Sequence, residues 1–158
     1  MASALYLYNK VLEYLGGGVI DLKTDTIKLM LVTSAYVPSA VHDVLADVKA
    51  SPDPEVVAVA SPSNGYTTGG QALTGQTYTS TDSPARSVFD ANNVSWPALT
   101  ATFRYGILYA EKTVGSPAIV NPLIGYILFD TAPADKIFSG VDFTVVWNAA
   151  GILALTKS

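Results

Sequence analysis

Hydrophobic side chains recur at three- and four-residue spacing at the start of the chain. This period places them on one face of a helix, and Ser3 is positioned to cap its first turn. The run Gly16-Gly17-Gly18 follows, and glycine often ends a helix because it reaches the left-handed backbone conformation. The pattern predicts an amphipathic N-terminal helix with a glycine cap over residues 1–18, whose apolar positions are Leu5, Tyr8, Val11, Leu12 and Leu15.

Beyond the glycines the pattern changes to strands. Residues 26–33 (TIKLMLVT) are almost continuously apolar with Lys28 as the one charge, which predicts a central strand covered on both faces. Residues 123–129 predict a second core strand. Between these two strands, apolar residues at positions 41, 44, 45 and 48 return to helical spacing and predict one short helix near residues 41–50.

The remaining segments have the pattern of short strands separated by turns. Residues 82–87 are expected to form a loop and residues 130–140 a polar connection. About eight strands with such spacing predict a mainly β protein, an antiparallel β-sandwich or barrel with two small helices. We expect one domain over residues 1–158, with a β-rich body from residue 19 onward. The clearest alternation predicts a single strand with one side formed by Ala101, Phe103, Tyr105, Ile107 and Tyr109.

The chain carries little charge for its size. Nine Lys and Arg residues oppose thirteen Asp and Glu residues, which gives a net charge of −4. Charged residues make up 14% of the chain, against about 25% in an average soluble domain. We interpret this as a subunit that uses much of its surface for partners; the alternative is a soluble β-domain with a neutral surface rich in Thr, Ser and Gly. The acidic balance disfavours nucleic acid as a partner.

No segment has the pattern of a targeting signal or a membrane span. The first basic residue is Lys10, whereas a secretory signal has its positive charge ahead of an apolar stretch and a cleavage site. No apolar run approaches the roughly 18 residues of a transmembrane helix. We therefore expect a protein made in the cytoplasm that stays there or leaves without a classical signal, and no membrane partner.

The residues offer little for catalysis. The chain has no cysteine, and His42 is its one histidine. Hydroxyl nucleophiles usually need a histidine base, and a lone histidine in an apparent helix is better explained as a surface residue. Glu13, Glu55 and Glu111 lie on charged faces or strand ends by pattern, and the aspartates lie mainly in turns and caps. No catalytic residue and no cofactor is predicted.

Two further segments are candidates for ligand binding because of their residue spacing. Asp21 and Asp25 form a loosely acidic turn whose oxygens could hold calcium, but a capped turn explains them equally well. Residues 64–75 (NGYTTGGQALTG) lack the pattern of a phosphate-binding loop, so their glycines are expected to serve turns and bulges. No metal ligand is predicted.

Aromatic residues are the remaining candidates for binding. A carbohydrate or nucleic-acid platform is one interpretation, but stacking on nucleic acid needs basic neighbours and only Arg104 and Lys112 are near. Tyrosine is also common in protein interfaces, so core or interface is the preferred assignment. The tyrosines concerned are Tyr6, Tyr8, Tyr14, Tyr105, Tyr109 and Tyr126.

Several stretches together resemble a family of small virion proteins of tailed bacteriophages. The resemblance spans nearly the whole chain. It implies a structural protein without catalytic residues, either a head decoration (cement) protein or a tail-associated protein. The segments that carry it are ALYLYNKVLEYLGGGVIDLKTDTIKLMLVTSAYVP, HDVLADV, NGYTTGGQALTG, VSWPALTATFRYGILY, NPLIGYILFD and FTVVWNAAGILAL.

We therefore expect a non-enzymatic decoration protein on the capsid exterior, bound to the outer surface of the major capsid protein lattice. It is expected to act as a homo-oligomer, a trimer or another symmetric assembly, through surface burial. The contact is expected on the loops 52–63 and 113–122, together with aromatic residues at strand edges. The alternatives are a tail or baseplate component that contacts host glycans, and a small hydrolase of cell-wall polymers, which the single histidine and scattered carboxylates disfavour.

Overall fold

The computed structural model describes residues 4–50, 52–82, 85–129 and 134–156. These residues form a mainly β protein with twelve strands in antiparallel sheets and two short helices, and the strands close into no barrel. The elements are β1 (Leu5–Leu7), α1 (Val11–Gly16), β2 (Ile27–Val32), α2 (Leu45–Val48), β3 (Gln71–Ala72), β4 (Thr77–Asp82), β5 (Ala85–Asp90), β6 (Val94–Phe103), β7 (Tyr105–Ala110), β8 (Thr113–Val114), β9 (Ile119–Val120), β10 (Leu123–Leu128), β11 (Lys136–Val145) and β12 (Leu153–Thr156).

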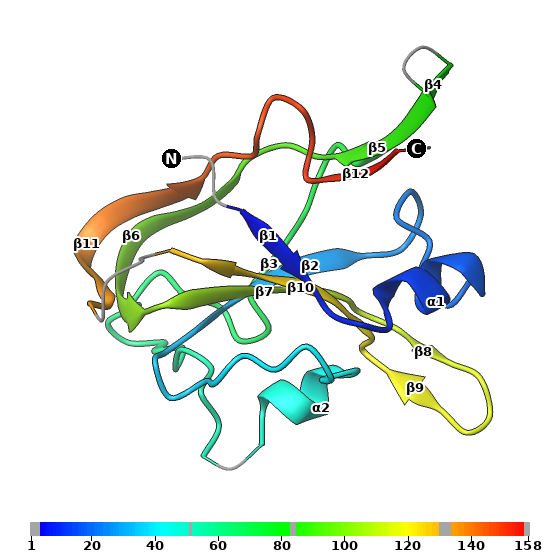
Figure 1. Cartoon of the computed structure of the whole chain (residues 1–158). Helices are drawn as coiled ribbons and strands as arrows, with labels where there is room; N and C mark the ends of the chain where they lie inside the picture. The colour runs from blue at the N-terminus through cyan, green and yellow to red at the C-terminus, as the bar shows by residue number, and fades with distance from the viewer. Residues whose placement is uncertain (1–3, 51, 83–84, 130–133, 157–158) are drawn as a thin grey trace.

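A five-stranded antiparallel sheet lies at the centre, in the order β1-β10-β7-β2-β3 (Figure 1). β2 is buried along nearly its whole length and pairs with β7, so that Leu29 lies opposite Leu108. β10 is also mostly buried and pairs with the other side of β7. Both predicted core strands are therefore confirmed, because continuous apolar runs of this length are covered on both faces.

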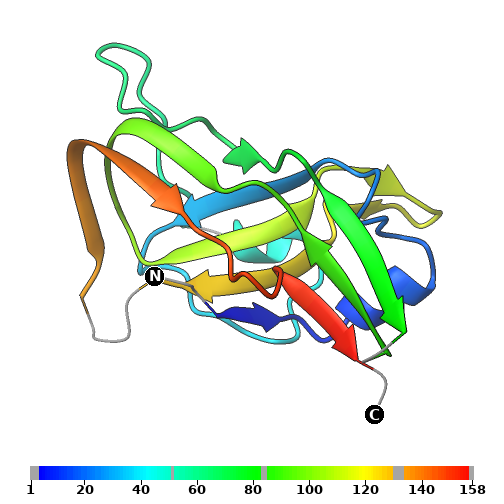
Figure 2. The same cartoon turned by 90° about the horizontal axis from the view of Figure 1, so that it is seen from above.

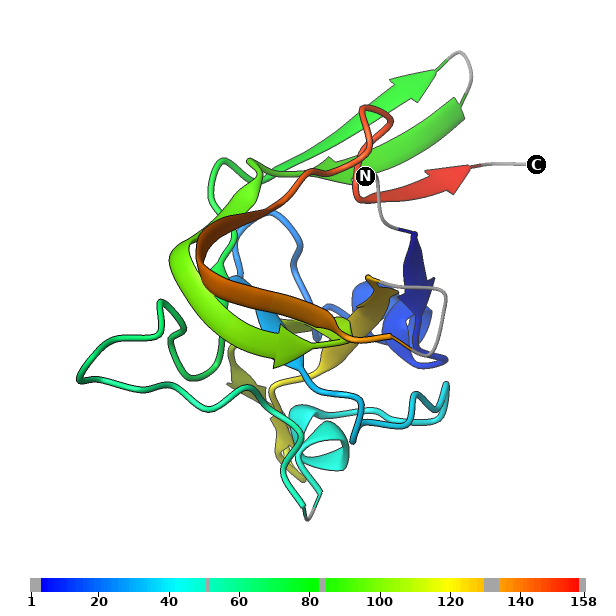
Figure 3. The same cartoon turned by 90° about the vertical axis from the view of Figure 1, so that its left-hand side faces the viewer.

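A second layer covers one face of this sheet. It consists of the two-stranded ribbon β11-β6 and the three-stranded sheet β12-β5-β4, which Figures 2 and 3 show on the same side of the central strands. The ribbon bends where Ala98 and Gly140 have φ angles of 48° and 66°. The Asp142 carboxylate accepts the Ala98 N–H at 2.9 Å and holds the bend. The main core lies between the layers and includes Trp96 and Phe103, both fully buried.

The other face of the central sheet is covered by α2 and by the segment 33–44 that leads into it (Figures 1 and 3). A second apolar cluster lies there, in which Leu45 and Val48 of α2 meet Met30 of β2 and Ile107 of β7. β7 is covered on both sides, so the side chains on its two faces belong to different apolar clusters.

The predicted N-terminal helix is wrong in its first half. Residues 5–7 form β1 instead, and Tyr6 lies opposite Tyr126 of β10. A strand forms because it completes the edge of the central sheet, which a helix of a few residues cannot match in hydrogen bonds. The helix begins only after Lys10, and the predicted cap Ser3 lies outside the described residues. After the helix, Gly18 adopts the left-handed conformation with a φ of 71°.

The second predicted helix is also shorter than the pattern indicated. α2 contains only residues 45–48, and Val41 is 69% exposed on the preceding segment. The predicted strand over 101–109 is divided at Arg104 into β6 and β7. Phe103 points into the main core, whereas Tyr105 packs against the second cluster, so the chain changes sheets at this position.

Two segments expected to be connections contain strand. β5 begins at Ala85, within the loop predicted over 82–87, and pairs with β4 in a regular hairpin. β11 begins at Lys136, within the connection predicted over 130–140, and Lys136 pairs with Phe103 of β6. Residues 130–133 lie outside the described part of the chain.

Candidate functional site

A hollow of about 550 Å³ lies between α2 and the β8-β9 hairpin. Backbone bonds hold its two walls together, since the Leu45 N–H donates to the Asn121 carbonyl at 3.0 Å and Val44 forms an isolated bridge with Pro122. The lining is mainly apolar, with Lys49 as its one charged side chain. The residues that line this hollow are Val44, Leu45, Ala46, Lys49, Ala118, Val120 and Asn121.

The helical wall is positioned by a carboxylate at its start. Asp47 accepts the backbone N–H groups of Asp43 and Val44, at 2.8 and 3.1 Å. Burial raises the pKa of Asp47, but these two hydrogen bonds outweigh it and hold the pKa below its ordinary value. Leu45 and Val48 anchor the same turn in the second cluster, so the four-residue helix is fixed at both its start and its buried face.

A buried carboxylate fixes the adjoining loop. Glu55 is only 7% exposed, and its Oε1 accepts the Tyr66 hydroxyl at 3.0 Å and the Gly69 N–H. Its Oε2 pairs with Lys49, whose Nζ also lies 3.1 Å from a carboxylate oxygen of Asp53. Both oxygens of Glu55 are therefore engaged, and the carboxylate ties residue 55 to α2 and to the loop before β3.

The pKa values around Glu55 follow from this arrangement. Burial raises the pKa of Tyr66, and the negative charge of Glu55 and the hydrogen bond to it raise it further. Burial lowers the pKa of Lys49, but hydrogen bonds to Glu55 and Asp53 outweigh this and leave it above its ordinary value. Lys49 is thus held protonated and Tyr66 neutral at neutral pH, which suits a structural ion pair.

A second hollow of about 230 Å³ adjoins this cluster, and the side chain of Lys49 borders both hollows. Its lining comes largely from one loop segment, residues 53–58, together with Thr68. The loop is attached to the central sheet because the Val56 N–H donates to the Leu31 carbonyl at 3.0 Å.

Exposed valines lie on the segments before and after α2 and on β9, and Val57 and Val120 line the hollows. Val57 and Val37 are 76% and 77% exposed, and the segments that carry the five valines lie before α2, after α2 and in β9. We call the two hollows and these valines the α2 surface; the helix α2 lies on the side of the central sheet away from β12 (Figures 1 and 3). The valines are Val37, Val41, Val57, Val59 and Val120.

The two loops singled out by the sequence meet at the α2 surface. Loop 113–122 contributes Val120 to the first hollow, and loop 52–63 contributes most of the second. Sequence reasoning did not find the role of α2 and Lys49 between them, nor the burial of Glu55. The one signal is the apolar pattern at positions 41–48, which indicates a helix but not what the helix contacts.

The aromatic candidates divide between core and surface. Tyr6 is 49% exposed and stacks on Tyr126 with ring centroids 5.1 Å apart. Behind this pair the buried Tyr8 hydroxyl lies 2.7 Å from that of Tyr36, which in turn lies 3.1 Å from Nδ1 of His42. The single histidine therefore belongs to a chain of hydroxyls on the covered face of the central sheet.

The remaining tyrosine candidates are held within the fold. Tyr14 is buried in the main core, and Tyr109 donates its hydroxyl to the Gly69 carbonyl at 2.9 Å. Tyr105 packs edge-on against both Tyr36 and Tyr126. The six tyrosines therefore form no single platform.

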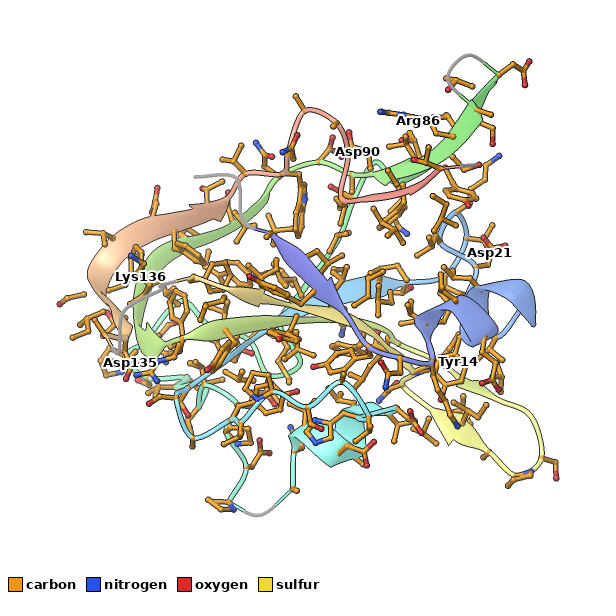
Figure 4. The ribbon with its side chains drawn as sticks, in the orientation of Figure 1. Tyr14, Asp21, Arg86, Asp90, Asp135 and Lys136 are labelled. Atoms are coloured by element: carbon orange, nitrogen blue, oxygen red, sulfur yellow. The ribbon has the colours of Figure 1, made fainter. Side chains whose placement is uncertain are left out.

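The acidic candidates are occupied by local partners. Asp21, which Figure 4 places in the loop after α1, accepts the Lys23 N–H at 2.9 Å. Asp25 binds Lys112 through both carboxylate oxygens, at 2.7 and 2.8 Å. The Asp21 carboxylate therefore caps this turn.

The other two glutamates lie apart from this turn. Glu111 pairs with Lys28 at 2.6 Å, and Glu13 is exposed in the first turn of α1. Within the described ranges, no three His, Cys, Asp or Glu side chains gather as metal ligands would.

Comparison with protein-family models, with curated proteins and with solved structures found no match to this chain. Across residues 4–50, 52–82, 85–129 and 134–156, no helix has the length and apolar character needed to cross a bilayer.

Proposed function

We propose that this chain is a non-enzymatic structural subunit of a tailed-phage virion that decorates the outer surface of the major capsid lattice. The resemblance of its segments to small phage virion proteins supports the class of protein. The α2 surface supports the mode of action, which is burial of apolar side chains against a neighbour. In this proposal the sandwich expected from the sequence corresponds to the central sheet facing the β6-β11 and β12-β5-β4 layers.

The observation that carries the proposal is the set of five exposed valines on the segments before and after α2 and on β9. Burying one fully exposed valine side chain contributes about 1.5–3 kcal/mol. The five are 44–77% exposed, so their remaining exposure equals about three full side chains and contributes roughly 5–9 kcal/mol. Association itself costs about 4–15 kcal/mol in lost freedom of motion. One copy therefore binds modestly through these side chains, and a trimer or other symmetric oligomer gains by engaging several lattice sites at once.

A decoration protein of this kind stabilises the shell by mass action. It binds the assembled, expanded lattice and not the separated subunits, so its binding free energy adds to that of the assembled state. The hollow beside Lys49 offers a place for an apolar side chain of the lattice, and Lys49 remains paired with Glu55 and Asp53 while it does so.

The test uses capsids purified without this protein and a sedimentation assay. Val120→Asp and Val57→Asp each place a charge on the α2 surface and are expected to abolish cosedimentation. Val146→Asp is the matched control, because Val146 is 45% exposed but follows β11 on the other layer. Electron cryo-microscopy of virions is expected to show the chain on the capsid exterior, and its absence there would refute the proposal.

The exposed Tyr6, stacked on the half-buried Tyr126, favours a second candidate function, a tail or baseplate component that contacts host glycans. The two functions differ in copy number. Densitometry of purified virions is expected to give hundreds of copies per particle for a decoration protein, whereas a handful of copies would favour the tail.

A further inference from the structure

The β4 strand forms an exposed edge of the three-stranded sheet. Among the residues that the structure describes, it pairs with β5 alone in the order β12-β5-β4, and its register with β5 runs without a shift over all six residues. Every residue of β4 is exposed. Such an edge presents backbone N–H and C=O groups in the spacing that another strand needs.

The other edge strands carry features that discourage pairing. β1 has three residues, β3, β8 and β9 have two each, and β12 has four. β6 is long but contains Pro97. β11 is long, but two register shifts interrupt it and it carries Lys136 and Asp142. These are the usual ways in which natural sheets protect an edge. β4 has none of them along residues 77–81, since its sequence TYTST contains no charge, proline or glycine.

We propose that β4 pairs in antiparallel fashion with β4 of a second copy of this chain, about a twofold axis at Thr79. The two three-stranded sheets then become one continuous six-stranded sheet. This contact does not depend on the proposed function, because two copies in solution are enough to form it.

The register at Thr79 follows from the side chains. A twofold axis perpendicular to the sheet keeps each face on its own side, so residues of the same parity lie opposite one another. Thr79 then faces Thr79 of the second copy, and Tyr78 faces Ser80 in both directions. Asp82 falls opposite Gln76, so the strand's one carboxylate does not meet its own copy. Cross-strand pairs of this kind, threonine with threonine and tyrosine with serine, stabilise the pairing of adjacent strands.

The second copy is the occupant that the geometry favours. An isologous contact needs one surface that complements itself, and an uncharged antiparallel edge does so through its backbone. β4 and β5 project beyond the central sheet and away from α2 (Figures 1 and 3), which leaves space for a second hairpin beside them. One pair of strands buries less than the roughly 1,200 Å² of a stable dimer, so the contact is reversible in dilute solution.

The chain allows a clean crosslinking test because it has no cysteine. In Thr79→Cys the two sulfurs meet at the axis, since residues opposite one another have Cα atoms about 4.5–5.5 Å apart and a disulfide spans that distance. We expect mild oxidation to give a disulfide-linked dimer at least about tenfold faster than in either control, because pairing raises the effective thiol concentration.

Two controls separate this pairing from random collision. Thr77→Cys changes the same strand and face, but the two introduced thiols would lie about 13 Å apart across the axis. Ala154→Cys places an exposed thiol on β12, the opposite edge of the same sheet, where Ala154 pairs with Val88 and Val88 with Thr79. Crosslinking in either control at the rate of Thr79→Cys, or none in Thr79→Cys, would overturn the proposal. Circular dichroism confirms that each variant is folded before oxidation.

Discussion

Glu55→Gln tests whether the buried carboxylate holds the α2 surface together. The change keeps the size of the side chain, so the loss reports on charge and hydrogen bonding and not on a cavity. In the native chain Oε1 accepts from Tyr66 and Gly69, and Oε2 faces Lys49. A glutamine oxygen can still accept the first two donors, but its amide NH₂ then faces the lysine ammonium.

The magnitude follows from these contacts. Loss of one hydrogen bond to a charged group costs about 1.5–3 kcal/mol, and the two remaining bonds weaken because their acceptor is now neutral. Lys49 limits the loss, since its side chain is 30% exposed and stays 3.1 Å from Asp53. We therefore expect Glu55→Gln to lower the free energy of unfolding by about 2–3 kcal/mol.

Denaturant unfolding measures this loss, with Asp53→Asn as the control. The Asp53 side chain is 47% exposed, so its pair with Lys49 is expected to contribute less than about 1 kcal/mol. A double-mutant cycle with Lys49→Met isolates the pair between residues 49 and 55. Equal losses for Glu55→Gln and Asp53→Asn, or no coupling in the cycle, would refute the role given to Glu55.

Two pH predictions follow from the same structure. Folding lowers the pKa of Asp47, so its hydrogen bonds stabilise the fold at higher pH and this stabilisation is lost as pH falls through the folded pKa. In thermal unfolding, the wild type should lose stability below about pH 4 more steeply than Asp47→Asn. Parallel stability curves for the two proteins would contradict this. Burial raises the pKa of three tyrosines, so they favour the folded state below their ordinary pKa of 10.0 and this contribution is lost as pH rises above it. These three are Tyr8, Tyr66 and Tyr109. Ultraviolet titration should then show that their phenolates form late, together with unfolding. Ionisation of all nine tyrosines near pH 10 in a folded chain would contradict this.

The central strands could be predicted because their own residues decide their burial. In β2 and β10 the apolar run is continuous, and a run of that length is buried on both faces whatever its neighbours are. The mainly β class follows from the same kind of local pattern. The prediction was weaker wherever a partner strand decides the conformation.

β1 and the start of β5 show why some strand residues were missed. Leu5, Tyr8 and Val11 have helical spacing, but pairing with β10 overrides it and draws residues 5–7 into the sheet. Ala85 and Arg86 have no apolar alternation to mark a strand, yet they are ordered by β4 on one side, and β12 pairs with Arg86 on the other. β10 and β12 lie far along the chain from β1 and β5, so no short stretch of sequence contains either of these pairs.

The candidate site was found in part for the same reason. The loops 52–63 and 113–122 were identifiable because they are long and contain proline. Their meeting at α2 depends on contacts far apart in the sequence, such as the bridge between Val44 and Pro122. Glu55 looked like a strand-end residue, and only the fold brings Lys49, Tyr66 and Gly69 around its carboxylate.

The two proposed contacts are compatible within one molecule. The helix α2 lies on one side of the central sheet, and β4 projects from the layer on the other side (Figures 1 and 3). A subunit bound to a shell through its valines therefore still presents β4 to a neighbour. Because binding to the shell raises the local concentration of subunits, it favours a strand pairing that is reversible in dilute solution. Each pairing in turn links two bound subunits, so that neither dissociates independently.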